Sequence, residues 1–126
     1  MSPELCLFLA AGLSLVTFLV HLFAGGVHVA RPLLASTALP PASKWLNYYC
    51  WHLVTLMLGF MALGFFWLGT APYMPGIVFL TLLAVSSSML SLFVGLKAAI
   101  NPFRFPSTSL FAVIAVSGGA AILMAA

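Results

Sequence analysis

Three histidines are the most reactive side chains of an almost uncharged chain. His21, His28 and His52 lie within or beside long apolar runs of a 126-residue sequence. An ionisable side chain inside a membrane is costly, which makes each one a candidate for a functional site. The alternative is structural: neutral His21 and His52 would form hydrogen bonds between helices and contribute about 1 kcal/mol to packing specificity.

Spacing places the first two histidines on one face of a predicted helix. Small and polar residues recur there at intervals of three and four: Ala10, Ser14, Thr17, His21, Ala24, His28 and Arg31. A second stripe consists of Tyr48, His52, Thr55, Gly59 and Ala62. Such residues gather at helix contacts in membranes, so we expect His21, His52 and Tyr48 to face the interior of a bundle. Cys50 and Trp51 should face other surroundings, with Trp51 as an interfacial anchor.

The most specific functional hypothesis is a haem site. Two imidazoles on facing helices can ligate an iron from both sides, small residues would make room for the macrocycle, and a basic residue such as Arg31 or Lys44 could pair with its propionates. The candidate cofactor is haem b. The candidate cofactor-binding residues are His21, His52, Arg31 and Tyr48.

A metal site is the second option for the same histidines, because imidazole suits both zinc and copper. The candidate ligands are His21, His28 and His52. This set lacks a fourth ligand on the same face, since Cys50 lies about 200 degrees from His52 around an ideal helix.

Glu4 is the only acidic residue of the sequence, and this excludes several kinds of site. Paired-carboxylate hydrolysis, a Ser-His-Asp triad and an oxygen-ligated magnesium or calcium site each need an acid that the chain lacks. The basic residues are scattered singly, so no nucleic-acid surface is expected. They are Arg31, Lys44, Lys97 and Arg104. We therefore favour a non-catalytic protein over an enzyme.

Composition places these residues in a membrane. The chain is 64% hydrophobic and 4% charged, with a mean hydropathy of +1.25, whereas roughly a quarter of residues are charged in soluble domains. A hydrocarbon core about 30 Å thick needs roughly 20 apolar residues of helix. Four segments meet this requirement, over residues 3–24, 45–69, 76–100 and 107–126. The first helix could continue to Arg31, where Pro32 disfavours helical geometry in the residue before it.

The predicted fold is an all-α, four-helix transmembrane bundle in a single domain. Positive residues flank the first and third connections, and the middle connection has none. The positive-inside bias therefore predicts that both termini face the outer side. We expect a location in the bacterial inner membrane. The expected partners are the lipid bilayer and either further copies of the chain or other membrane subunits, because small-residue stripes promote helix association.

Several functions remain open at this stage. The first is a non-catalytic accessory subunit or cofactor-holding bundle, with a histidine-lined interior site near the cytoplasmic face. The second is a small homo-oligomeric transporter or a proton or cation channel, with a pathway between the serines of the third helix and the histidine stripe. An enzyme acting on a lipid or quinone through His28 and Arg31 is a third possibility.

Overall fold

The computed structural model describes residues 2–102 and 106–125, which fold into helices and contain no strand. Two positions of the sequence analysis, Arg104 and the predicted last helical residue Ala126, lie outside the described residues. The all-α class is confirmed. Four helical segments are long and apolar enough to cross a membrane: Pro3–Ala35, Pro41–Thr70, Met74–Lys97 and Pro106–Ala125.

The first segment is one continuous helix of three parts: α1 at Pro3–Leu19, a π-helix, η1, at Val20–Ala30, and α2 at Arg31–Ala35. Ser2 caps its start by accepting a hydrogen bond from the Leu5 N–H. The helix thus passes both Gly25 and Arg31. A proline inside an α-helix disturbs the preceding turn, and here that turn is π-helical, with the Arg31 N–H bonded to the Gly26 carbonyl.

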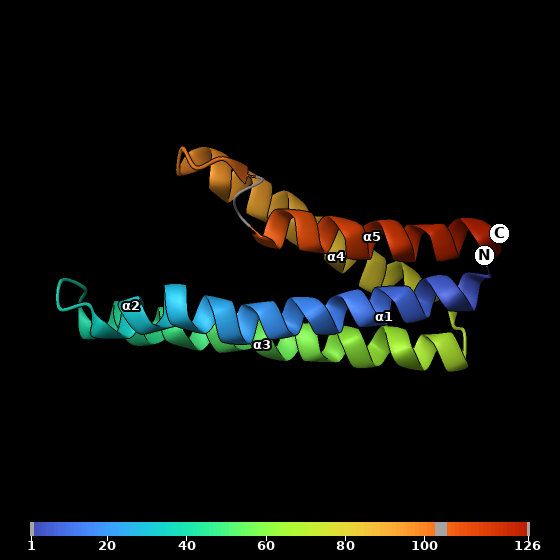
Figure 1. Cartoon of the computed structure of the whole chain (residues 1–126), viewed down its shortest axis with the longest axis horizontal. Coiled ribbons are helices and arrows are strands. Elements are labelled where there is room, and N and C mark those ends of the chain that lie inside the picture. The colour runs from blue at the N-terminus through green and yellow to red at the C-terminus, as the bar shows by residue number, and fades with distance from the viewer. Residues whose placement is uncertain (1, 103–105, 126) are drawn as a thin grey trace.

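The remaining segments complete two helical hairpins. α3 spans Pro41–Thr70, α4 spans Met74–Lys97 and α5 spans Pro106–Ala125. A short turn joins α2 to α3, and Lys44 fastens it by donating a hydrogen bond from Nζ to the Leu34 carbonyl at 3.1 Å. α1 packs against both α3 and α5, and α4 packs mainly on α5. Both termini lie at one end, and the two hairpins diverge toward the other end (Figure 1).

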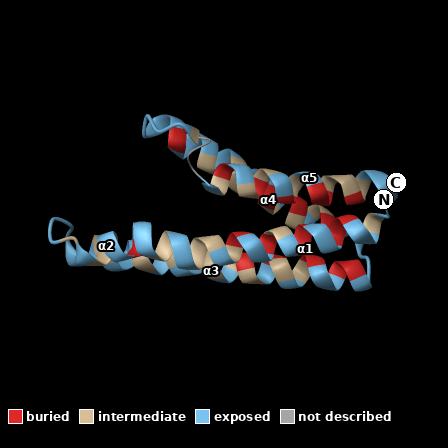
Figure 2. Ribbon diagram, viewed as in Figure 1, coloured by how far each residue is buried: buried red, intermediate tan, exposed pale blue. Residues whose placement is uncertain are grey.

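Burial is concentrated in the half of the bundle that holds the termini (Figure 2). The largest fully buried side chains there are Leu7, Leu58, Met61, Phe65 and Ile114. Toward α2, the first hairpin projects without cover from α4 or α5, and most of its residues are half-buried or exposed. The bundle is therefore closed at one end and open at the other.

The predicted stripe of the first helix is confirmed only as far as Thr17. Ala10, Ser14 and Thr17 are buried, whereas His28 and Arg31 are exposed. The change occurs because the backbone of α5 packs closely against α1 but lies farther from η1. A stripe faces inward along its whole length only where one neighbour covers the whole helix.

The predicted inward stripe of the second helix is half-buried at Tyr48, Thr55, Gly59 and Ala62, but it does not contain the most buried residues of α3. α3 buries large apolar residues, Leu58, Met61, Phe65 and Leu68, whereas His52 is exposed. The bulky face of α3 fills the space between the helices, and the small-residue face lies at its edge, where Gly59 meets the ring of Phe18. Trp51 and Val54 continue the bulky face at helical spacing.

Candidate functional site

The candidate site is built on η1. In a π-helix each N–H bonds to the carbonyl five residues earlier, a rare arrangement that occurs often at functional sites. This segment carries His21 and His28 together with Gly25 and Gly26. A Cβ at position 25 would overlap the indole ring of Trp51. Gly25 therefore lets the Trp51 side chain of α3 pack directly on the η1 backbone.

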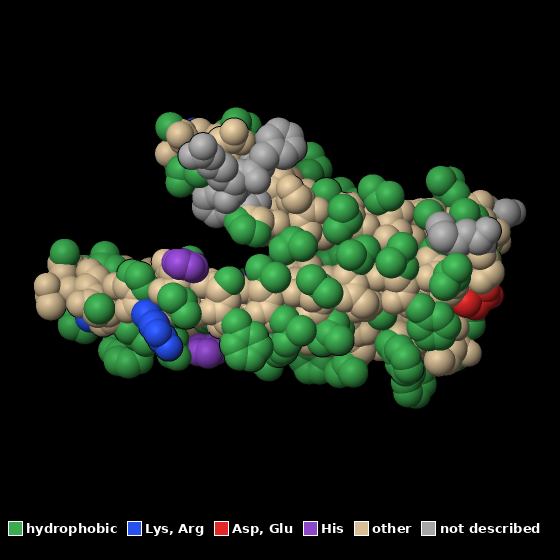
Figure 3. All heavy atoms as spheres, viewed as in Figure 1, with side chains coloured by type: hydrophobic (Ala, Val, Ile, Leu, Met, Phe, Trp, Pro, Cys, Tyr) green, Lys and Arg blue, Asp and Glu red, His purple; other side chains and the backbone are tan. Residues whose placement is uncertain are grey.

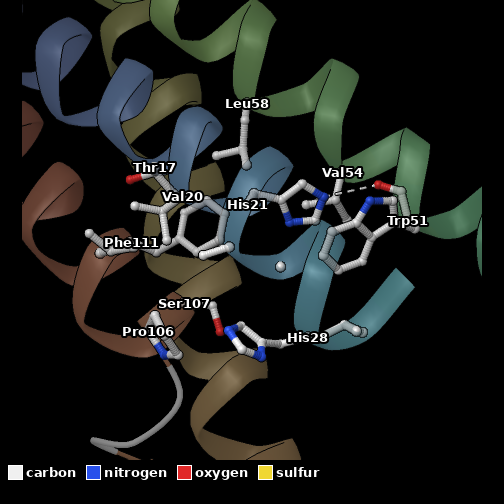
Figure 4. Close-up of a pocket in the computed structure, with 14 residues that line it drawn as sticks. Thr17, Val20, His21, His28, Trp51, Val54, Leu58, Pro106, Ser107 and Phe111 are labelled. Carbon is white, nitrogen blue, oxygen red and sulfur yellow. Dashed lines mark hydrogen bonds between the residues drawn. The ribbon is translucent and has the colours of Figure 1, made fainter. Parts of the chain in front are cut away.

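Trp51 holds His21 in one orientation. The two rings are stacked, with centroids 3.8 Å apart and an interplanar angle of 17°. His21 Nε2 also lies 3.2 Å from the Trp51 carbonyl oxygen, shown as a dashed line in Figure 4. A carbonyl only accepts, so Nε2 carries the hydrogen and donates it. In the neutral ring, Nδ1 is then an acceptor, and no other described residue bonds to it.

His21 and Trp51 line an apolar cavity of about 270 Å³ between η1, α3 and the start of α5. Its other walls include Val54, Leu58 and Phe111. His28 of η1 and Ser107 of α5 approach this space from facing helices (Figure 4). The cavity thus offers apolar surface, two aromatic rings and a few polar groups.

A second cavity, of about 600 Å³, continues between α3 and α4. The two cavities share six lining residues: His21, Val29, Trp51, Val54, Ser107 and Phe111. We call the combined space the hairpin cleft. On its α4–α5 side, Ser91 Oγ lies 2.6 Å from Ser107 Oγ and 2.8 Å from Thr108 Oγ1. These hydroxyl bonds hold the start of α5 against α4.

His52, Tyr48 and Arg31 lie elsewhere. They line a separate cavity of about 310 Å³ between η1 and α3, which we call the Arg31 cavity. His52 packs edge-on against Tyr48, with centroids 4.5 Å apart. His21 and His52 thus line different cavities on the two sides of Trp51, and a site shared by both histidines stays a prediction. One residue is about 100 degrees of helix, so α3 presents Trp51 to His21 and turns His52 away.

The predicted set of metal ligands is not assembled. Within residues 2–102 and 106–125, no three His, Cys, Asp or Glu side chains lie close enough together to hold a metal ion. His21 and His28 line the hairpin cleft, and His52 lines the Arg31 cavity.

Sequence reasoning missed Trp51, Ser107 and Phe111 as cleft residues. The spacing of Trp51 from Val54 and Leu58 contains a usable signal, since all three continue one helix face. Ser107 and Phe111 depend on how α5 docks, which no local pattern encodes. Comparison with protein families, curated proteins and solved structures found no match for this chain, so its function has to be argued from its own residues.

Proposed function

We propose that this protein is a small, non-catalytic, multi-pass membrane protein that holds a lipid-soluble molecule with a flat, hydroxyl-bearing headgroup in the hairpin cleft. A quinol is the chemical class that fits this description. The observation that carries the proposal is the clamped ring of His21, whose Nε2 is bonded to Trp51 while Nδ1 has no partner among the described residues.

The lining of the cleft supports this class of ligand. Small-molecule sites are mostly apolar, with a few polar groups that fix orientation, and the hairpin cleft has that composition. A hydroxyl on the ligand would donate to His21 Nδ1, and the ring of Phe111 would cover its headgroup. The cleft lies between helices that are long and apolar enough to cross a membrane, so an apolar tail could extend into lipid.

A haem held by both His21 and His52 is the other form of this cofactor-holding proposal, and the geometry favours it less. The two imidazoles line different cavities, and Trp51 lines both. Ligation by both histidines would require the indole to move. A Soret band in the purified protein, lost in both His21→Ala and His52→Ala, would establish haem in place of the quinol.

Trp51 supplies the test of the quinol proposal. Replacing the exposed Trp45 and Trp67 with phenylalanine leaves Trp51 as the only tryptophan. We expect a short-chain benzoquinol to quench its fluorescence saturably. His21→Ala should weaken the binding about three- to tenfold, the size of one hydrogen bond.

His52→Ala is the matched control, because it removes an imidazole next to Trp51 in sequence but outside the cleft. It should leave the affinity unchanged. Quenching that rises linearly with quinol and is the same in His21→Ala would mean simple partitioning into the detergent, and it would refute the proposal.

Transport by a homo-oligomer is the alternative class and stays a prediction. The bonded hydroxyls of Ser91, Ser107 and Thr108 are the groups that a polar pathway would use. Proton flux into liposomes between about pH 6 and about pH 8, where a histidine relay would titrate, tests it. The quinol-holding proposal expects none.

A further inference from the structure

Arg31 is a charge without a counter-ion in the described part of the chain. A guanidinium stays protonated in proteins, yet within residues 2–102 and 106–125 its side chain makes no ion pair or hydrogen bond. Glu4, the only acidic residue of the sequence, lies at the opposite end of the bundle (Figure 3). Any anionic partner of Arg31 must therefore come from outside these residues.

Two further hydrogen-bond donors line the same cavity. Tyr48 and His52 of α3 are held together edge-to-face, and neither side chain has a hydrogen-bond partner among the described residues. Together with the guanidinium fork, they bring donors from two helices around a space of about 310 Å³. These donors suit the oxygens of a phosphate group, because an arginine can donate to two of the oxygens at once.

The surroundings point to a lipid rather than a soluble anion. Phe23 and Val27 line the cavity and are 66% and 46% exposed, which offers apolar surface for an acyl chain. The 17 residues of α1 span about 25 Å, so the following η1 and Arg31 reach the level where headgroups begin. The exposed aromatic rings of Trp45 and Tyr49 lie on the adjoining part of α3, as expected for an interface.

We infer that the Arg31 cavity binds the phosphate of an anionic phospholipid, with Arg31 as the charged partner and Tyr48 and His52 as additional donors. The Arg31 cavity adjoins the hairpin cleft only at Trp51, and the inference does not depend on a quinol binding in the cleft. Basic pockets at the cytoplasmic side of membrane helices are a general means of binding anionic lipid headgroups.

Native mass spectrometry of the full chain in detergent tests the inference, with phosphatidylglycerol and phosphatidylcholine added in turn. We expect phosphatidylglycerol to bind preferentially, and Arg31→Gln to lower its affinity about tenfold or more. Tyr48→Phe and His52→Ala should each lower it about threefold. Arg31→Lys keeps the charge but loses the fork, so it should bind with intermediate affinity.

Lys97→Gln is the matched control. Lys97 is a single exposed basic residue at the end of α4, lying over the Phe93 ring and outside the Arg31 cavity. If Lys97→Gln and Arg31→Gln lower the affinity for phosphatidylglycerol equally, the binding reflects general charge attraction and the inference is overturned. Displacement of the lipid by equimolar inorganic phosphate would overturn the lipid assignment. Helical circular dichroism of each variant shows whether the loss reflects unfolding.

Discussion

At the scale of single residues, the site depends on which of two neighbours faces His21. Trp51 and His52 are adjacent in sequence, but only Trp51 follows the buried face of Val54 and Leu58. Its indole fixes His21 by stacking and its carbonyl by a hydrogen bond. His52 is left with Tyr48 at the Arg31 cavity. Two separate polar sites thus arise from one pair of adjacent residues.

Gly25 and Gly26 provide a direct test of this clamp. A Cβ at Gly25 would meet the Trp51 indole, whereas one at Gly26 would meet nothing within 4 Å. We expect Gly25→Ala to displace the indole and destabilise the protein by about 1–3 kcal/mol. Gly26→Ala should be neutral or stabilising by up to about 1 kcal/mol. Thermal unfolding in detergent and the near-ultraviolet circular dichroism of tryptophan measure both; equal effects would contradict the packing.

At the scale of helices, the two hairpins make close contacts at residues that do not belong to a regular stripe of small residues three or four positions apart. Ala112, Ala115 and Gly119 form a small-residue stripe at roughly helical spacing in the fourth helix, and all three are half-buried. The buried residues of α5 are Thr108, Phe111, Ile114, Ser117, Gly118 and Ala121. Gly118 lies against Thr81 of α4 and the ring of Phe65 of α3. It allows three helices to approach one another.

Substitutions at the neighbouring glycines 118 and 119 distinguish the observed packing of α5 from the stripe that the sequence pattern indicates. A Cβ at Gly118 would overlap Thr81 Oγ1, and one at Gly119 would have no neighbour within 4 Å. We therefore expect Gly118→Ala to cost about 1–3 kcal/mol of stability, and Gly119→Ala to cost nothing measurable. The midpoints of thermal unfolding in detergent, measured for both variants, show which substitution destabilises the protein. Greater damage from Gly119→Ala would favour the stripe read from sequence.

At the scale of the whole molecule, the chain has a closed end with the termini and an open end with the cleft. The only acidic residue lies at the closed end, and Arg31, Lys44 and Lys97 lie toward the open end. We retain the prediction that the open end faces the cytoplasm, since positive residues favour that side. Association with further copies or other membrane subunits also stays a prediction.

Cysteine labelling tests the orientation. Thr37 lies exposed in the turn between α2 and α3, and Ala71 lies exposed between α3 and α4. In a Cys50→Ser background the remaining native thiol, Cys6, is buried. We expect an impermeant maleimide to label Ala71→Cys in intact cells and Thr37→Cys only after the membrane is broken. The reverse pattern would contradict the predicted topology.

Sequence alone predicts four helices long and apolar enough to cross a membrane, because hydrophobic length is a local property. It also indicates His21 as a candidate site residue, and its single carboxylate, Glu4, excludes sites that need paired or buried acids. The packing of Trp51 rather than His52 on His21, and the change of the first helix to a π-helix beneath the indole, become visible only in the folded chain. The physical reason is that helix phase depends on the neighbouring helices. α3 buries its bulky face where three helices meet, and α5 leaves η1 uncovered, so the predicted inward face changes partway along the helix.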